Sequence, residues 1–253
     1  DPKTVAEITG IPADDLIEAA RLYAQTDKGS IVYAMGITQH ANGTDNVKSL
    51  ANLAMVTGNI GKESTGVNPL RGQNNVQGAC DMGGLPNVYT GYQKVDVPEV
   101  QAKMEQAWGA KLSAKVGLPV TKIMPAAIDG DIKGIYIMGE NPVISDPDQA
   151  HVLKAFDNLE FLVVQDIFLT ETAKLADVVL PAACFAEKDA TFTNSERRIQ
   201  RVRKAVAPPA GVPEDWRTLM EVGRRMGIDW SYDSAEQIFE EIAFLTPSYG
   251  GVS

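Results

Sequence analysis

The chain has 253 residues, of which 44% are hydrophobic and 22% charged, a globular balance that suits one large α/β domain or two smaller ones. Its formal net charge of −10 argues against nucleic acid and anionic membrane surfaces as partners. Cys80 and Cys184 form no CxxC pair, which excludes a local zinc or iron–sulfur motif and a disulfide framework.

The chain begins at Asp1 without an initiator methionine, so we expect an internal piece of a longer protein. No apolar run reaches the length of a membrane span, and we expect no membrane contact by this piece. Targeting signals of the parent are not expected within an internal piece, so the sequence does not decide the compartment of the parent. A cytoplasmic parent is favoured, with a periplasmic one as the alternative.

The first part of the chain alternates helix and strand patterns. Apolar residues recur at helical spacing through residues 1–27, which predicts one helix. The apolar run Ser30–Met35 ends at Gly36 and has the pattern of a buried parallel strand, after which polar residues such as Gln39 follow. Residues 45–58 repeat the helical spacing. This order is typical of an α/β domain.

Residues 70–84 combine one cation, four side-chain amides and four glycines with little that could build a core. Glycine costs backbone entropy on folding, and this cost is usual where the backbone must approach a ligand closely. Amides can read the edge of a heterocycle, and the guanidinium of Arg71 can bind a small oxyanion through two hydrogen bonds. The stretch is a candidate ligand site, with a glycine-rich surface loop as the alternative.

From residue 131 the strand and helix patterns alternate again after a less regular region, which we interpret as an insertion over about 70–130. Because at least three strands are buried and followed by helices, we expect a doubly wound, mostly parallel sheet within a single domain over 1–253. The expected strands lie at 133–138, 159–164, 177–181 and 198–206, and the expected helices at 99–108, 147–156, 170–176, from 213 and at 234–245.

Glycine or polar side chains directly follow three of these strands, at Met35–Gln39, Gly139–Pro142 and Gln165–Asp166. Ligands of such sheets bind outside the carboxyl ends of the strands, so we expect these residues to form one rim. No GxGxxG motif follows a strand, which argues against a nicotinamide dinucleotide. The carboxylate of Asp166 or Asp215 can accept the N1–H and N2–H2 edge of guanine, with a helix cap or a ribose contact as the alternative for each.

These residues resemble the catalytic (alpha) subunits of formate dehydrogenases, which belong to the bis-molybdopterin guanine dinucleotide oxidoreductases. The resemblance extends from about residue 4 to 245, and the segment Arg71–Gly83 is specific to formate dehydrogenases. The other matching segments are shared with the wider superfamily: Ala54–Lys62, Gly66–Pro69, Tyr136–Pro142, Val164–Pro181 and Thr193–Arg198.

The resemblance implies a molybdopterin guanine dinucleotide cofactor with molybdenum or tungsten, ligated by a cysteine or selenocysteine outside this chain. A 4Fe–4S cluster is expected in the missing N-terminal part. The expected partners are formate or carbon dioxide, the remaining domains of the same subunit, and iron–sulfur or NAD-linked redox subunits that carry the electrons away. No metal ligand is expected within the chain itself.

The resemblance assigns roles residue by residue. Arg71 matches the arginine that orients formate beside the metal, and its planar cation suits that role. Asn141 and Ser145 differ from the aspartate and threonine of some relatives, although both keep hydrogen-bonding capacity. The expected cofactor contacts are Met35, Gly36, Gln39, Gly72, Gln73, Gly139, Glu140, Asn141, Ser145, Gln165, Asp166 and Asp215, the last near the guanine.

Other residues receive a structural interpretation. Cys80 is expected to be a small buried thiol and His40 a surface or strand-end residue. The basic run Arg197–Lys204 is expected to be a solvated edge or a subunit contact, with a cofactor phosphate as the alternative. Two further functions remain open: an oxidoreductase acting on nitrate or an arsenic oxyanion, and a cofactor-free structural domain like that of the NADH dehydrogenase large subunit.

Overall fold

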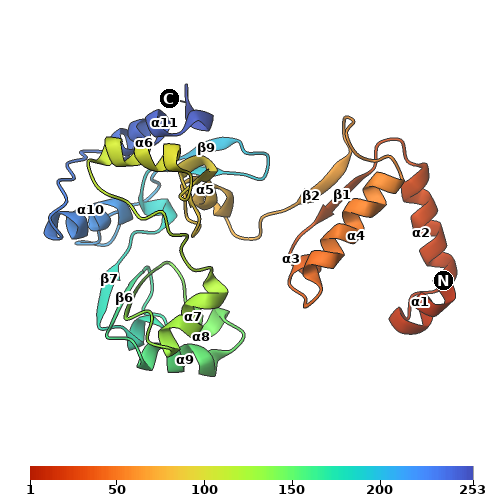
Figure 1. The fold of residues 1–253 in the computed structure, drawn as a ribbon, viewed down its shortest axis with the longest axis horizontal. Helices are drawn as coiled ribbons and strands as arrows, with labels where there is room; N and C mark the ends of the chain where they lie inside the picture. Colours follow the sequence, from red (N-terminus) through yellow and green to blue (C-terminus); the bar gives the residue numbers. More distant parts are fainter. Residues whose placement is uncertain (253) are drawn as a thin grey trace. The chain divides into compact units, whose positions relative to one another are not determined.

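The computed structural model describes residues 1–252, and its contacts divide into two compact units, Asp1–Val76 and Gln77–Ser253 (Figure 1). A parallel pair of strands organises the first unit, and a three-stranded parallel sheet organises the second. A single domain with an insertion at about 70–130 stays a prediction. Within residues 1–252, none of the helices has the length and apolar character needed to cross a membrane.

The first unit is built on strand β1 (Ser30–Tyr33), which pairs in parallel with β2 (Gly66–Pro69). The buried amide of Asn59 joins the elements around this pair, because its Oδ1 accepts from the Gly29 N–H at 3.0 Å and its Nδ2 donates to the Tyr23 carbonyl at 3.2 Å. The helices of this unit are α1 (Pro2–Thr9), α2 (Ala13–Gln25), α3 (Met35–Thr38) and α4 (Gly43–Val56).

Two expectations for this unit are wrong. The single helix over 1–27 is two helices, because Gly10 ends α1 in the left-handed conformation with φ of 75°. The strand at 30–35 does not belong to one sheet with the later strands, since β1 pairs with β2 in a sheet of its own. β1 is also less buried than its apolar run predicts, with Val32 59% exposed.

The second unit contains the sheet that the sequence predicts most directly. Strands β5 (Gly134–Met138), β6 (Phe161–Asp166) and β7 (Val178–Pro181) lie in the order β5-β6-β7, all parallel. Helices α7 (Val120–Ile128) and α9 (Gln149–Asp157) cover one face of this sheet, beside which Figure 1 shows them. The expected strands at 133–138, 159–164 and 177–181 and the helix at 147–156 are confirmed.

Strand alternation gives the two faces of this sheet different chemistry. Ile137, Leu162 and Val164 point into the apolar core beneath α7 and α9. The register pairs Met138 with Gln165, so the opposite face carries Gln165 and, two residues before Met138, Tyr136. Tyr136 and Gln165 can therefore contact residues of the second unit that lie outside the apolar core beneath α7 and α9.

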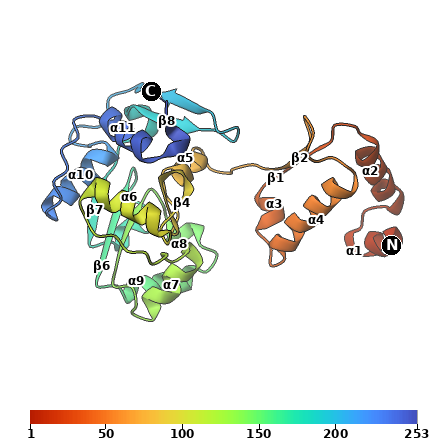
Figure 2. The ribbon, with the colours of Figure 1, turned by 45° about the horizontal axis from the view of Figure 1, so that its top comes forward.

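The remaining part of the second unit joins two short hairpins to helices. Figures 1 and 2 show α11 beside the β8–β9 hairpin. The expected helices at 99–108 and 234–245 and the helix from 213 are confirmed, and the strand over 198–206 is confirmed as the shorter β9. The elements are α5 (Val76–Asp81), β3 (Val88–Tyr89), β4 (Gln93–Lys94), α6 (Pro98–Trp108), β8 (Ala190–Thr193), β9 (Ile199–Val202), α10 (Asp215–Arg225) and α11 (Ala235–Leu245), with short helices at α8 (Pro142–Ser145), Thr90–Tyr92, Ala173–Leu175, Phe185–Glu187 and Pro247–Tyr249.

Candidate functional site

In the first unit, two predicted site segments follow neighbouring parallel strands. Met35 and Gly36 come directly after β1, and Arg71 and Gly72 come directly after β2. The Leu70 N–H donates to the carbonyl of the last β1 residue at 2.8 Å, which extends the pairing to the start of the loop. A Cβ added at Gly72 would contact the Met35 Cε at 3.4 Å, so the two segments touch.

The loop after β2 is held by its own backbone while its side chains stay accessible. Arg71, Gly72 and Gln73 are all exposed, and the Val76 N–H donates to the Gln73 carbonyl at 3.4 Å. Asn75 has a φ of 59°, a left-handed conformation that asparagine tolerates better than most residues. The loop therefore presents a cation and an amide in a fixed turn.

The other end of this region is the short helix α3. The Gln39 N–H donates to the Met35 carbonyl at 2.9 Å at the end of the helix, and the Gln39 side chain is exposed. The ring Nε2 of His40 lies 2.8 Å from the Gly36 carbonyl oxygen and is exposed, in keeping with a local backbone role.

In the second unit, the chain turns sharply at the end of β5. Gly139 has a φ of 65°, and its N–H donates to the Gln165 carbonyl at 2.9 Å, so the turn stays attached to β6. Within residues 1–252, no heavy atom beyond the chain neighbours lies within 4 Å of the position that a Cβ would take at Gly139, which leaves its backbone open to a ligand. The carboxylate of Glu140 then accepts a hydrogen bond from the hydroxyl of Ser145.

Asn141 connects the same turn to the segment after β6. Its Oδ1 accepts from the Thr172 hydroxyl at 2.7 Å and from the Thr172 N–H at 3.2 Å. Its Nδ2 donates to the Glu171 carboxylate at 2.9 Å, and this hydrogen bond is the main reason that the pKa of Glu171 lies below its usual value. The side chain of Asn141 thus connects the turn to Glu171 and Thr172 through three hydrogen bonds.

Asp166 occupies the end of β6, where its Oδ1 accepts from the Phe168 N–H at 3.1 Å. This hydrogen bond to the residue two positions on forms an Asx turn, which is neither the helix cap nor the ribose contact expected as the alternative to guanine. The turn leaves Phe168 73% exposed and Leu169 64% exposed. Asp166 therefore shapes an apolar projection at the sheet edge through its Oδ1.

A chain of polar contacts runs from β5 to α10 across the sheet face opposite α7 and α9. The Tyr136 hydroxyl donates to Oε1 of Gln165, and Nε2 of Gln165 donates to Oδ1 of Asp215 at 2.7 Å. Lys188 forms an ion pair with the other oxygen of Asp215, and both side chains are 23% exposed. Asp215 begins helix α10, where the helix dipole also favours a negative charge.

The structure therefore gathers the predicted residues into two sets, one in each unit. Lys188, Tyr136, Thr172 and Glu171 were missed by sequence reasoning, although each contacts a predicted residue. Tyr136, Glu171 and Thr172 lie within segments that resemble the family, but the resemblance assigns none of them a role, and Lys188 lies outside those segments. The first set is Met35, Gly36, Gln39, Arg71, Gly72 and Gln73; the second is Gly139, Glu140, Asn141, Ser145, Gln165, Asp166 and Asp215.

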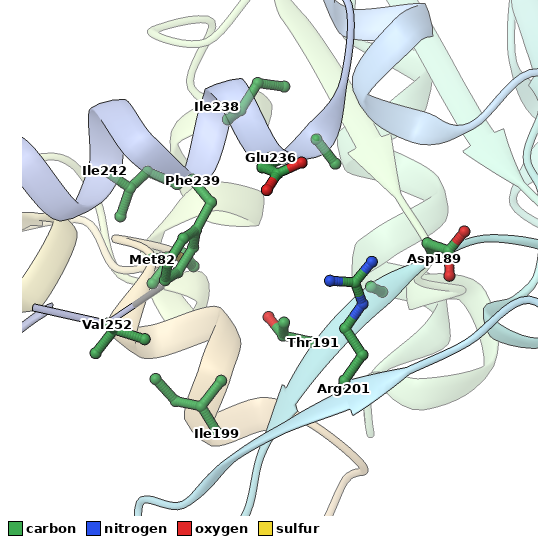
Figure 3. A pocket seen from close by; sticks show the side chains of 12 residues that line it. Met82, Asp189, Thr191, Ile199, Arg201, Glu236, Ile238, Phe239, Ile242 and Val252 are labelled. Carbon is green, nitrogen blue, oxygen red and sulfur yellow. The ribbon is translucent and has the colours of Figure 1, made fainter.

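The residues that received a structural interpretation lie outside both sets. Cys80 is 7% exposed, as expected for a small buried thiol. Residues 1–252 contain no group of three or more His, Cys, Asp or Glu side chains arranged to hold a metal ion. Arg201 of the basic run lies at the opening of a groove of about 410 Å³ between α11 and the β8–β9 hairpin (Figure 3).

That groove is mainly apolar and contains none of the predicted site residues. Figure 3 shows Phe239 and Ile242 from α11 on one wall, with Ile199 from β9 on another and the guanidinium of Arg201 beside the opening. Its lining residues are Met82, Asp189, Ala190, Thr191, Ile199, Arg201, Ala235, Glu236, Ile238, Phe239, Ile242 and Val252.

Comparison with known proteins places the chain in a family. The model of the molybdopterin oxidoreductase family matches residues 12–225, so the chain belongs to that family. It is 54% identical to the F420-dependent formate dehydrogenase subunit alpha of Methanocaldococcus jannaschii, over 100% of this chain and 37% of that protein. It is 44% identical to formate dehydrogenase H of Escherichia coli, over 100% of this chain and 35% of that protein.

The solved structure of acetylene hydratase from Pelobacter acetylenicus shares the fold. The TM-score is 0.67 at 20% sequence identity, covering 100% of this chain and 37% of that chain. The chain thus spans little more than a third of the length of these relatives. The family implies a molybdopterin cofactor with molybdenum or tungsten.

Proposed function

We propose that this chain is the central cofactor-binding part of the catalytic subunit of a formate dehydrogenase with molybdopterin guanine dinucleotide and molybdenum or tungsten. The complete subunit converts formate to carbon dioxide, one proton and two electrons, or runs the reverse reaction. Identity of 54% to an F420-dependent formate dehydrogenase subunit alpha supports this substrate. The placement of Arg71 and Gly72 beside Met35 and Gly36 is the observation that carries the proposal.

Arg71 is proposed to bind the formate carboxylate. Its guanidinium is exposed on a loop whose backbone is fixed by the Gln73 to Val76 turn. A guanidinium stays charged at every physiological pH and offers parallel donors that match the two oxygens of a carboxylate. Arg71 thereby orients formate and stabilises negative charge near the reacting carbon. Gly72 and Gln73 are proposed to contact the pterin from the same loop.

Asp215 is proposed to recognise guanine. A carboxylate has about four lone-pair positions, of which Gln165 and Lys188 each use one. One lone pair therefore remains on each oxygen, and two parallel acceptors match the adjacent N1–H and N2–H2 donors of guanine. Adenine lacks that pair of donors on the same edge. Asp215 is 23% exposed, so this edge is accessible to a ligand.

The strand ends of the second unit are proposed to hold the rest of the dinucleotide. Gly139 offers an unobstructed backbone, and Glu140, Ser145 and Asp166 offer hydrogen-bonding groups beside it. Asn141 contributes mainly by fixing the turn, since its amide is already bonded to Thr172 and Glu171. These donor sets fit a cofactor with a heterocycle, a sugar and phosphates.

When bound, the metal and its pterin sulfurs supply the two-electron chemistry, which no residue of this chain can perform. The metal-binding cysteine or selenocysteine and a 4Fe–4S cluster are proposed to lie in the remaining part of the subunit, so the piece alone is inactive. Iron–sulfur or NAD-linked redox subunits are proposed to receive the electrons. The single domain over 1–253 is proposed to form in that complete subunit.

The proposal is tested by substitution of Arg71→Lys in the full-length subunit. Lysine keeps the charge but loses the second parallel donor. A charge-assisted hydrogen bond contributes about 1.5–3 kcal/mol, so kcat/KM for formate should fall about 10- to 150-fold. Cofactor content, measured by metal analysis, should stay unchanged.

The exposed Arg21 on α2 provides a matched control, because Arg21→Lys makes the same chemical change at a residue that belongs to neither residue set. Formate turnover by the Arg21→Lys enzyme should equal that of the wild type. Unchanged formate turnover in the Arg71→Lys enzyme, with full cofactor content, would contradict the role of Arg71. A wild-type enzyme that reduces nitrate or an arsenic oxyanion and does not oxidise formate would contradict the substrate.

A further inference from the structure

Tyr136 and Gln165 meet because of strand register. Met138 on β5 is paired with Gln165 on β6, and Tyr136 lies two residues before Met138 on the same strand face. The phenol thus lies beside the amide, and the Tyr136 hydroxyl donates to Gln165 Oε1. Tyr136 is 38% exposed, whereas Gln165 is completely buried.

A glutamine amide has one accepting end and one donating end, so its orientation decides what it offers to a neighbour. With the oxygen of Gln165 directed to the Tyr136 hydroxyl, its nitrogen faces Asp215 and donates at 2.7 Å. The reversed amide would bring its oxygen against a carboxylate. Burial, and then the negative charge of Asp215, raise the pKa of Tyr136, so the phenol remains protonated and able to donate at neutral pH.

Asp215 is in turn held from two directions. Gln165 reaches Oδ1 from the sheet, and Lys188 reaches Oδ2 from the segment that follows Phe185–Glu187. Two donors on different oxygens fix the rotation of the carboxylate plane, whereas one donor would leave it free to turn. The direction of the two unused lone pairs therefore depends on the Gln165 amide as much as on Lys188.

We propose that Tyr136 is a positioning residue for nucleotide selectivity, which acts through Gln165 to align the Asp215 carboxylate with the donor edge of guanine. This inference rests on the proposed binding of a guanine dinucleotide. Tyr136 is proposed to act on guanine through its hydroxyl, by way of Gln165 and Asp215. A phenylalanine ring at this position would therefore not preserve the effect. Hydrogen bonds in such a chain also polarise one another, which makes the Gln165 nitrogen a stronger donor.

The test measures nucleotide binding to the full-length subunit prepared without cofactor, with GMP, IMP and AMP as probes in calorimetric titrations. IMP lacks the exocyclic amino group of GMP, and AMP also lacks the N1 proton. Tyr136→Phe removes only the hydroxyl. The dissociation constant for GMP should rise about tenfold and that for AMP should stay within twofold, because one of two paired hydrogen bonds to the base is weakened.

Tyr89→Phe is the matched control, since the Tyr89 hydroxyl is buried and has no hydrogen-bond partner among the described residues. It should leave the preference for GMP over IMP unchanged. A second variant, Gln165→Met, keeps the side-chain volume and removes the amide. Gln165→Met should lose the preference for GMP over IMP. The double variant with Tyr136→Phe should show little further loss, because both changes interrupt the same series of hydrogen bonds from Tyr136 to Asp215.

The outcomes separate the two proposals. A wild-type subunit that binds GMP and AMP equally well would overturn guanine recognition by Asp215, and with it the proposed dinucleotide. A wild-type subunit that prefers GMP, with Tyr136→Phe retaining that preference within twofold, would overturn the role of Tyr136 alone. Equal weakening of GMP and AMP in Tyr136→Phe, or additive losses in the double variant, would also overturn it.

Discussion

The buried hydroxyl of Thr172 should determine how firmly the turn after β5 is held. Thr172 is fully buried; its Oγ1 donates to Asn141 Oδ1 at 2.7 Å and accepts from the Val143 N–H at 3.2 Å. Val143 lies at the start of α8, where N–H groups have no partner within the helix. Thr172→Val keeps the shape but leaves that buried donor unsatisfied.

The magnitude follows from the contacts. A buried donor without a partner costs about 1–3 kcal/mol, and each 1.4 kcal/mol corresponds to a factor of ten. The Val143 amide should therefore exchange its hydrogen about 5- to 150-fold faster in Thr172→Val than in the wild type. The assay is hydrogen–deuterium exchange with mass spectrometry on the full-length subunit, read on peptides that contain residues 139–146.

Thr121 on α7 is the matched control, because it is exposed and has no side-chain hydrogen bond within residues 1–252. Thr121→Val should leave exchange in 139–146 unchanged. Exchange of the Val143 amide within twofold of the wild type in Thr172→Val would refute the argument that the hydroxyl holds this turn.

Three further changes have definite expectations. Gly139→Ala should lower the free energy of unfolding by about 1–2 kcal/mol in thermal melts, because alanine is strained at a φ of 65°. No clash adds to this cost, since the described residues leave space for the new methyl group. An unchanged melting temperature would show that the backbone relaxes. Burial, and then the hydrogen bond to Glu241, raise the pKa of Tyr232 from 10.0 to about 12, so this stabilising contribution is complete below pH 10 and is lost as the pH rises toward 12. Tyr232→Phe should therefore flatten the decline in melting temperature over that window, and the ultraviolet titration should lose the phenol that ionises near pH 12. Lys188→Met should weaken GMP binding to the apo subunit about tenfold, because Oδ2 of Asp215 loses its ion pair and the carboxylate can rotate. An unchanged affinity for GMP would contradict this role of Lys188.

Short-range patterns in the sequence located most of the elements. The apolar runs at 133–138 and 159–164 became β5 and β6, since strands buried against helices need continuous apolar residues. The helix at 234–245 begins after Ser234, whose side chain accepts from the Gln237 N–H at 3.3 Å as an N-cap does. The residue types in 70–84 predict a ligand loop, and this role stays a prediction.

The sequence did not reveal the partner of β1. The four residues of β2, Gly66–Pro69, include glycine, asparagine and proline, which disfavour strands in isolation. β2 exists because β1 offers it hydrogen bonds along a matching register, a long-range contact that local composition cannot predict. That pairing brings Gly72, the residue after Arg71, against Met35.

The sequence by itself determined which residue types are present at the strand ends and, through resemblance, the family to which they belong. Only the tertiary structure decided that Tyr136, Gln165, Asp215 and Lys188 form one chain of contacts. These residues come from two strands, a helix start and a connecting segment, and no periodic pattern relates them. Parallel strand register and the packing of α10 bring them together, because hydrogen bonds depend on distance in space and not on separation along the chain.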